Sequence, residues 1–474
     1  MSRPLVISGS VLLVDADAEP LRDAALLVRD GAIAAVGPAG ELRASVPEAQ
    51  DGGHHDVLLP GLIDAHSHAR RTPLAAHGIG GGPLERFLVA LAEATPLDPR
   101  DEALRSGADG LATGITATQA LVHDFGDEDA YAASARAVLD GYGASGARAA
   151  LALGLTDRDE WGPDDVDAPA RGIAPERFAE VAGGLLGRRV GRATIDAVGP
   201  VAPQWCSDRA LAAIAAAGAR RIHAHLLESP RQRLLADVAG DPLARLDGAG
   251  LLGPATSLAH GVWLADDDVA RLAASGAVLV HNPGSNELIG VGRLPLRERL
   301  DAGLRVAFGC DSHLPTDPPD AFAELRRAIA VAAARGTVVS AREALRMAWA
   351  GGAAALVRDD LGRLAVGARA DVVALRLPAA LGAADPRTTV VTEADRDAVA
   401  RTWVDGELVF PWPATVAEAV DAAASRASER LALDAAGRTA RRGATAETWS
   451  RVDGAWRRLA ERAGRSEPGV EVRG

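Results

Sequence analysis

The sequence contains no lysine, so arginine supplies all 51 basic side chains. A chain without lysine cannot form a lysine Schiff base, use a lysine as a base, or bridge two metal ions with a carbamylated lysine. Cysteine is almost as scarce, because only Cys206 and Cys310 are present. Two cysteines cannot build a disulfide framework, which predicts a reducing, cytoplasmic environment.

Long hydrophobic runs are also missing. No apolar run approaches the roughly 20 residues that a membrane-spanning helix needs, and the first residues lack the apolar stretch and cleavage site of a secretory signal. The formal net charge of −13 at pH 7 argues against nucleic acid or an anionic membrane as a partner. We therefore expect a small-molecule substrate, with a homodimer as an open alternative to a monomer.

The two ends of the chain contain short strand-like runs that are typical of one small β domain. Asp30-Gly31 stands between alternating apolar pairs, which predicts a hairpin turn. We expect segments 1–58 and 361–412 to form one β-sandwich, with strands at 4–14, 24–28, 32–36, 57–59, 372–375, 390–391 and 400–410.

Residues 59–360 alternate strand-like runs with helical windows rich in alanine, leucine and arginine. This alternation predicts a parallel sheet of an α/β protein. Together with the strand that ends at His66, the runs number about eight, as in a TIM-type (β/α)8 barrel. The predicted strands are 117–121, 149–153, 195–198, 222–226, 257–260, 278–280 and 305–308.

Residues 413–474 follow the second β segment as a helical extension. Trp449, Val452, Trp456 and Leu459 have the spacing of one apolar helix face, which we interpret as packing and not as a cofactor or partner site.

Two histidines one residue apart end the first barrel strand, in the run Pro60-Gly61-Leu62-Ile63-Asp64-Ala65-His66-Ser67-His68. Residues i and i+2 of a strand point to the same side, so His66 and His68 are placed as two ligands of one metal. The histidines of an isolated His-x-His pair are more often ordinary polar residues at the end of a strand. Here the residues at the other strand ends favour the metal-site interpretation.

Further polar residues stand at or after four more predicted strand ends, where reactive groups of a (β/α)8 barrel gather. The second barrel pair is His223 and His225, with Glu228 three residues beyond. The remaining strand ends carry His260, the polar turn His281-Asn282-Pro283-Gly284-Ser285-Asn286, and Asp311.

Imidazole nitrogen and carboxylate oxygen are ligands that zinc and iron(II) accept. His66, His68 and His225 with Asp311 are the candidate ligands of one metal, and His223 is the alternative to His225 because both face the same way. A metal of this kind lowers the pKa of a bound water from roughly 15.7 to about 7, and a neighbouring carboxylate can relay the proton.

These motifs resemble the amidohydrolase superfamily, in the branch that contains cytosine, guanine and S-adenosylhomocysteine deaminases and triazine hydrolases. The resemblance extends from about Leu5 to Phe410, and the helical region after it is longer than the branch leads us to expect. The motifs that carry it are Pro60 to His68, His225-x-x-Glu228, Ala259-His260-Gly261, His281 to Asn286, Gly309-Cys310-Asp311 and Gly362 to Asp371.

The resemblance implies a (β/α)8 barrel, a β-sandwich from both chain ends, and one divalent metal, with zinc favoured over iron. It implies that His66, His68, His225 and Asp311 hold the metal, and its His-x-x-Glu spacing selects His225 over His223. It also implies catalytic roles for Glu228, His260 and Asp311. The missing lysine independently agrees with a single metal.

The mechanism that follows is a hypothesis. Hydroxide oriented by His260 and Asp311 attacks an electrophilic ring or amidine carbon, while Glu228 transfers a proton to the neighbouring nitrogen. Asp311 or Glu228 then protonates the leaving amine. The sequence thus predicts a metal-dependent deaminase that acts on a nitrogen heterocycle or amidine.

The substrate pocket departs from the branch at Gly199-Pro200-Val201, where valine replaces a histidine that contacts substrate in several relatives. A purine nucleoside pocket therefore does not follow from the sequence. The candidate substrate contacts are Arg70, Gln119, His123, Gln204, Trp205 and Asn282.

Two alternatives stand beside deamination. The same site can hydrolyse a different bond, by opening an imidazolone-like ring or displacing chloride, and only deamination must release ammonia. A catalytically inactive scaffold is disfavoured, because inactive relatives usually lose metal ligands and this chain has all four, with Glu228 and His260.

Overall fold

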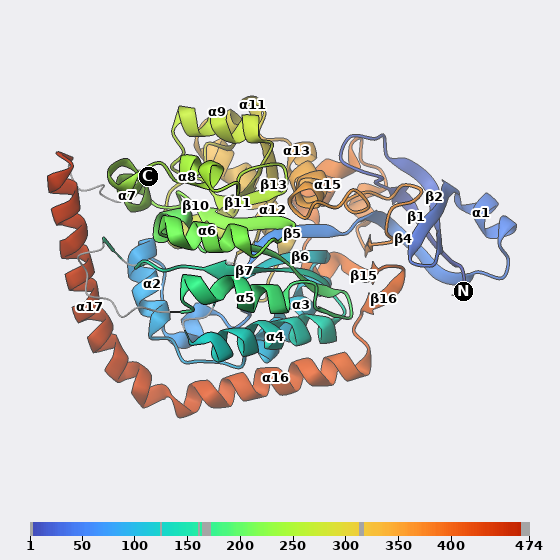
Figure 1. Cartoon of the computed structure of the whole chain (residues 1–474). Coiled ribbons are helices and arrows are strands. Elements are labelled where there is room, and N and C mark those ends of the chain that lie inside the picture. Colours follow the sequence, from blue (N-terminus) through green and yellow to red (C-terminus); the bar gives the residue numbers. More distant parts are fainter. Residues whose placement is uncertain (1–2, 124–125, 160–161, 164–171, 312–316, 466–474) are drawn as a thin grey trace.

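The fold is taken from a computed structural model, which describes residues 3–123, 126–159, 162–163, 172–311 and 317–465. Its centre is a barrel of eight parallel strands surrounded by helices (Figure 1), so the predicted barrel is confirmed. The strands are β5 (Leu62–Ser67), β6 (Ile115–Val122), β7 (Arg148–Leu155), β9 (Ala193–Pro200), β10 (Arg221–Leu226), β11 (Thr256–His260), β12 (Val278–His281) and β13 (Arg305–Phe308).

The strands hydrogen-bond in the order β13-β12-β11-β10-β9-β7-β6-β5, with β8 (Arg189–Val190) paired to β9 outside this path. The first and last barrel strands meet just beyond their ends, where the Asp311 amide donates to the His66 carbonyl oxygen at 2.8 Å. This bond brings Asp311, three residues beyond β13, beside the histidines at the end of β5.

The helices around the barrel begin at residues that favour helix starts. Asp98, Ser229 and Asp241 each cap a helix with a side-chain oxygen, and each is followed by proline at the first helical position. The helices of the barrel include α2 (Leu84–Ala92), α3 (Pro99–Ala112), α7 (Pro230–Ala239) and α10 (Pro283–Leu288). The others are α4 (Glu128–Ser145), α5 (Pro175–Leu185), α6 (Asp208–Ala216), α8 (Pro242–Gly248), α9 (Asp266–Ser275), α11 (Leu296–Asp301), α12 (Ala321–Ala334), α13 (Ala341–Arg346) and α14 (Gly352–Ala355).

Both chain ends join in one seven-stranded mixed sheet, so the prediction of one small β domain built from both ends is confirmed. The strand order is β16-β15-β14-β4-β1-β2-β3, and α1 (Ala39–Ser45) packs on β2 and β3. The strands are β1 (Leu5–Leu12), β2 (Leu21–Arg29), β3 (Ala32–Pro38), β4 (Gln50–Pro60), β14 (Val372–Leu375), β15 (Val399–Val404) and β16 (Glu407–Phe410).

The predicted strand at 390–391 is wrong, because these residues lie in the helix α15 (Pro386–Glu393). Asp385 caps this helix by accepting a hydrogen bond from the Arg387 amide, and Pro386 occupies its first position. These start signals outweigh the β preference of two adjacent valines.

The C-terminal extension forms two long helices, α16 (Ala414–Leu433) and α17 (Ala435–Arg462), which run along the outside of the barrel (Figure 1). Val452, Trp456 and Leu459 of α17 are buried against Val89 of α2 and Leu234 of α7, which confirms the packing interpretation of this apolar face. Residues 466–474 of the predicted extension lie outside the described residues.

Charged contacts strengthen the same junction. The Arg231 guanidinium of α7 lies 5.0 Å from the ring centre of Trp449 and donates to Asp453 at 2.6 Å. The extension is therefore attached to α2 through Val89 and to α7 through Arg231 and Leu234. None of the helices in the described part of the chain is long and apolar enough to cross a membrane.

Candidate active site

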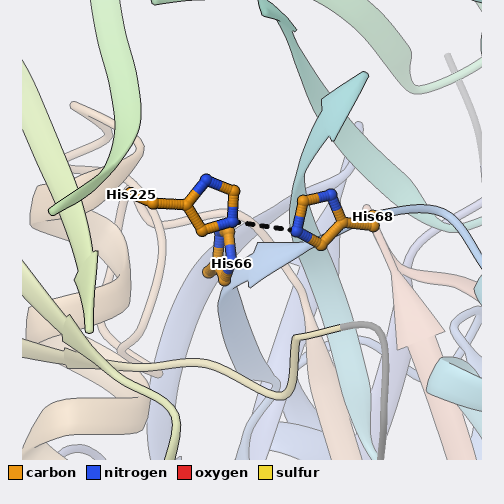
Figure 2. Close-up of side chains that lie close together, drawn as sticks. All are labelled: His66, His68 and His225. Atoms are coloured by element: carbon orange, nitrogen blue, oxygen red, sulfur yellow. Dashed lines mark hydrogen bonds between the residues drawn. The ribbon is translucent and has the colours of Figure 1, made fainter. Parts of the chain in front are cut away.

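Three imidazoles converge at the carboxyl ends of β5 and β10 (Figure 2). His68 Nε2 and His225 Nε2 are 3.0 Å apart, and their rings are stacked with an angle of 12° between the planes. The His66 ring stands nearly perpendicular to the His225 ring, at 89°. One ring nitrogen from each histidine lies within 4.8 Å of the other two, as ligands of one ion must.

Asp311 adds a carboxylate to this group. Its Oδ1 lies 3.7 Å from His66 Nε2 and 3.4 Å from His68 Nε2, so this oxygen faces the imidazoles. Its Oδ2 accepts a hydrogen bond from Ser285 Oγ at 2.7 Å and lies 3.7 Å from His260 Nε2. The two carboxylate oxygens therefore face different partners. We call His66, His68, His225 and Asp311 the candidate ligand cluster.

The backbone is strained at His260 and Asp311, whose side chains turn into the site. His260 and Asp311 have φ angles of 73° and 59°, a left-handed conformation that residues other than glycine adopt rarely. Ser257 of β11 faces His223, so the two-residue alternation of the strand predicts an inward position for Ala259 and not for His260. The positive φ breaks this alternation and directs the His260 ring toward Asp311.

Gly309 allows close packing where the chain turns from β13 to Asp311. A Cβ atom at this position would lie 2.2 Å from Asn282 Oδ1 and 3.1 Å from His66 Cβ. Any larger residue would therefore displace the strand end that carries Asp311.

Burial keeps the histidines neutral. Desolvation lowers the pKa of His66 and of His68 well below the usual value, although the nearby Asp311 acts in the opposite direction. The pKa of His225 is lowered for the same reason. Neutral imidazole is the form that binds metal.

Hydrogen bonds orient two of the rings. His225 Nδ1 donates to the Val201 carbonyl oxygen at 2.6 Å, which leaves the lone pair of His225 on Nε2. His66 Nδ1 lies 2.8 Å from His223 Nε2, so a proton on His66 Nδ1 leaves a lone pair on His66 Nε2 as well. Such outer partners fix the tautomer of metal-binding histidines.

His223 is thus an outer partner of His66, one pleat deeper in β10 than His225. Its Nδ1 lies 2.8 Å from Ser257 Oγ and 2.8 Å from Gln119 Nε2. The Gln119 amide donates to the Ala65 carbonyl oxygen and to Ser257 Oγ, both at 2.9 Å, and its oxygen accepts from Arg221 at 2.6 Å. Gln119, a predicted substrate contact, therefore lies beneath the ligand cluster with its amide group bonded to protein partners.

The cluster fits a divalent metal. His66 Nε2 is buried and has no hydrogen-bond partner among the described residues, although an unpaired buried polar atom is costly. Donors held 2.0–2.1 Å from a tetrahedral ion are about 3.3 Å apart, and the His68–His225 and His68–Asp311 separations of 3.0 and 3.4 Å lie close to this value. Three imidazoles and a carboxylate are a donor set that zinc accepts.

Glu228 lies just beyond β10 on the other side of His260. Its side chain is 4 % exposed, and its Oε1 lies 3.5 Å from His260 Nδ1. Burial, with the nearby Asp311 charge as a second cause, raises the pKa of Glu228 well above the usual value. A carboxyl group that keeps its proton at neutral pH can act as an acid.

Two residues of the His281–Asn286 turn contribute more than the sequence indicated. Asn286 Oδ1 lies 2.8 Å from His260 Nδ1, and Ser285 holds Asp311. The prediction chose only Asn282, whose Nδ2 is 3.5 Å from His260 Nδ1. Ser285 and Asn286 could have been suspected from the sequence because they belong to the same turn. Spacing alone, however, does not indicate which side chains of a turn face the site.

A cavity of about 460 Å³ opens beside the cluster. Three predicted substrate contacts, Arg70, His123 and Trp205, line it. Gln204, in the short helix η2 (Pro203–Trp205), and Asn282 are buried and do not belong to the described residues that line it.

The sequence of the chain matches the model of the amidohydrolase family over residues 57–409. The chain belongs to the amidohydrolase family. The match begins in β4 and ends in β16, so it includes the whole barrel and every residue of the candidate ligand cluster.

Named deaminases are similar to this amidohydrolase. A 5'-deoxyadenosine deaminase of Methanosarcina mazei is 28% identical over 426 residues, which are 86% of this chain and 93% of the relative. A 5-methylthioadenosine/S-adenosylhomocysteine deaminase of Syntrophobacter fumaroxidans is 31% identical and covers 86% of this chain and 92% of its own length. At the level of the family, this amidohydrolase is a hydrolytic deaminase, a hydrolase of carbon–nitrogen bonds other than peptide bonds.

Solved structures have the same fold. The zinc complex of an atrazine chlorohydrolase from Arthrobacter aurescens superposes with a TM-score of 0.73 at 25% identity, covering 89% of this chain and 99% of that one. A zinc-bound adenosine deaminase from Xanthomonas campestris also has a TM-score of 0.73, at 23% identity, and covers 90% of this chain and 98% of that one.

We expect His223→Leu to weaken metal binding by about 10- to 100-fold, the usual cost of losing an outer hydrogen-bond partner of a ligand. Leucine cannot accept the proton of His66 Nδ1, so the His66 ring loses its orientation. His223→Gln retains an acceptor and should recover much of the loss. Metal retained against a graded series of chelator concentrations measures the effect.

His281→Leu is the matched control for His223→Leu. His281 is also buried at the end of a barrel strand, and its ring nitrogens have no hydrogen-bond partner among the described residues. Equal metal loss in both leucine variants would show that the effect is a general one of disturbing the barrel, and the specific role of His223 would be withdrawn.

Proposed function

We propose that this amidohydrolase is a metal-dependent aminohydrolase that replaces the amino group of a nitrogen heterocycle or amidine with oxygen and releases ammonia. The observation that carries the proposal is the line of groups from Glu228 through His260 to Asp311. His260 Nδ1 lies 3.5 Å from Glu228 Oε1, His260 Nε2 lies 3.7 Å from Asp311 Oδ2, and Glu228 and Asp311 both line the cavity. Two carboxyl groups, of which Glu228 has a raised pKa, can donate and accept the protons of such a hydrolysis.

The candidate ligand cluster would hold one divalent metal, and zinc is the metal we propose. His66, His68 and His225 would supply imidazole nitrogen and Asp311 one carboxylate oxygen. When bound, such a metal lowers the pKa of water enough to supply hydroxide at neutral pH. The absence of lysine removes the residue that would bridge a second metal.

The protein groups would then move the protons. Asp311 Oδ2, already close to His260 Nε2, accepts the proton that the attacking water loses. Glu228 delivers its carboxyl proton to the ring nitrogen next to the amino-bearing carbon, which makes that carbon more electrophilic. A new carbon–oxygen bond forms, and the new hydroxyl group gives its proton to the now ionised Glu228. The carbon–nitrogen bond to the amino group then breaks as the departing nitrogen takes a proton from Asp311 or from the reprotonated Glu228. Water and the amine are thus converted to a carbonyl compound and ammonia.

The first substrates to test are aminated purines and their 5'-substituted nucleosides. This choice is supported by the names of the relatives, which act on 5'-deoxyadenosine and on 5-methylthioadenosine or S-adenosylhomocysteine. Val201 lines the cavity at the position where the branch often carries a substrate-binding histidine, so other aminated heterocycles belong in the same panel.

Ammonia release from this panel by zinc-loaded protein tests the proposal. We expect at least one aminated heterocycle to yield ammonia and the corresponding carbonyl product, with the rate lost after metal removal and restored by zinc. Chlorinated analogues of the same rings test the alternative reaction. Chloride release without ammonia release from any compound would replace deamination with dechlorination.

A further inference from the structure

The cavity extends well beyond the candidate ligand cluster, and its far wall is formed by α2. Leu84 is three and four residues from Phe87 and Leu88, and Leu91 is four and three residues from the same two, so the four side chains form one stripe along the helix. All four line the cavity. Leu88 and Leu91 are only partly buried, which means that this stripe still exposes apolar surface to the cavity.

The side that faces α2 is apolar as well. Leu121 and Val122 of β6, Val138 of α4, and Val201 and Trp205 beyond β9 line the same cavity. Leu88 packs against the hydrophobic cluster that contains Leu121, Val201 and Trp205, so the two apolar sides meet. A cavity of about 460 Å³ is in the range for drug-sized ligands, which exceeds what one heterocyclic ring fills.

Polar residues near α2 are occupied by protein partners. Glu102 accepts hydrogen bonds from Thr72 Oγ1 at 2.7 Å and from Arg105 at 2.9 Å. Thr95 Oγ1 donates to Asp434 at 2.6 Å. Hydroxyl groups of a ligand would therefore compete with existing bonds here, whereas a hydrocarbon group would not.

Arg70, His77 and His123 also line the cavity. Arg70 lies close enough to His68, His77 and His123 to lower the pKa of each, although burial is the larger cause for all three. Burial holds the pKa of His123 at about 3, so Arg70 is the permanent cation of this group. The cavity thus has polar groups near His68 and an apolar side along α2.

The apolar wall is held in place from outside (Figure 1). Glu85 of α2 accepts a hydrogen bond from Ser229 Oγ at 2.5 Å, and Val89 packs against α17. Arg441 of α17 donates to the carbonyl oxygen of Glu93 at 2.8 Å. A wall fixed in this way is preorganised, so a ligand does not have to order it on binding.

We infer that the substrate carries an apolar substituent on its aminated ring and that this substituent lies against the Leu84–Phe87–Leu88–Leu91 stripe of α2. This inference rests on the proposed function, because it assigns the ring to the candidate ligand cluster and only the substituent to α2. Within the panel of substrates, it favours aminated heterocycles with an alkyl, thioalkyl or aryl group of a few carbon atoms over nucleosides with a polar sugar.

A substituent series tests the inference. One aminated ring is prepared with hydrogen, methyl, propyl, butyl or benzyl at the same position, and with hydroxyethyl and carboxymethyl groups as polar counterparts. We expect kcat/KM for ammonia release to rise about fourfold for each buried methylene until the cavity is full. The polar counterparts should fall below the propyl compound.

Binding measured without chemistry separates this inference from the proposed function. The same series on a ring with hydrogen in place of the amino group cannot be deaminated, and calorimetry with zinc-loaded protein gives its Kd. We expect the Kd to fall by about fourfold per methylene here too. A steep binding series without ammonia release would overturn the proposed function alone. Ammonia release with a flat series, or with carboxymethyl as the best substituent, would overturn the inference alone.

Leu91→Asn locates the substituent. We expect the preference for propyl over hydrogen to shrink about tenfold or more in this variant, since an amide replaces apolar contact surface. Leu91→Met should keep the preference. The control Leu408→Asn changes an exposed leucine of β16 in the small sheet and should not alter the preference. An unchanged preference in a folded Leu91→Asn protein would place the substituent elsewhere.

Discussion

Replacing His225 with alanine is expected to remove the bound metal and, with it, all measurable ammonia release. His225 presents Nε2 to the candidate ligand cluster while its Nδ1 is held by the Val201 carbonyl oxygen. The remaining donors would be two imidazoles and one carboxylate. The loss should exceed the roughly 10- to 100-fold cost of removing an outer partner, because an inner ligand itself disappears.

Metal analysis after dialysis and an ammonia assay with added zinc measure this effect. His281→Ala is the control, because His281 is buried at the end of β12 and does not belong to the cluster. It should retain metal and turnover. The opposite assignment remains open to experiment: if His223→Ala loses metal completely and His225→Ala retains it, His223 is the ligand and the choice from the His-x-x-Glu spacing is wrong.

Glu228→Gln is expected to lower kcat by about 10²- to 10⁴-fold, the usual contribution of a positioned proton donor. Glutamine has nearly the same shape but no transferable carboxyl proton. Metal content and the unfolding midpoint should stay unchanged, because Glu228 lies on the far side of His260 from the ligand cluster. Steady-state ammonia release and metal analysis on the same preparation provide the measurement.

Glu85→Gln is the matched control for Glu228→Gln. Glu85 is also a buried carboxyl group with a raised pKa, and it bonds to Ser229, the neighbour of Glu228. Glutamine preserves the oxygen that accepts this bond, so the rate should change little. A near-normal rate in Glu228→Gln, or an equal loss in both variants, would contradict the assigned proton transfer.

The sequence was sufficient to predict the barrel because each of its strands is a short apolar run between helical windows. The strand-end histidines were also accessible to sequence reasoning, because the two-residue period of a strand puts His66 with His68 and His223 with His225 on one side. The sequence does not reveal how deep within the barrel each of these side chains lies. Gln119 illustrates this, since it follows the pattern of a strand-end pocket residue but is buried beneath His66.

Other parts of the site depend on backbone conformation, which periodicity does not contain. The positive φ of His260 brings its ring to Asp311 against the strand alternation, and Ser285 and Asn286 reach their partners from a helical turn. The strand predicted at 390–391 was wrong for a local reason. There the Asp385-Pro386 start signal was present in the sequence, but the two valines received more weight.

The seven-stranded sheet cannot finish folding until the strands that follow the barrel have been synthesised. β4 pairs with β14, which follows only after the whole barrel, and α17 comes later still. Synthesis at about 5–20 residues per second leaves β4 without this neighbour for a time on the order of tens of seconds. A nascent chain therefore presents an open sheet edge until β14 has been synthesised, and an unsupported cavity wall until α17 has been synthesised. Ribosomes that stall in this interval would release chains suited to chaperone capture and degradation, not to catalysis.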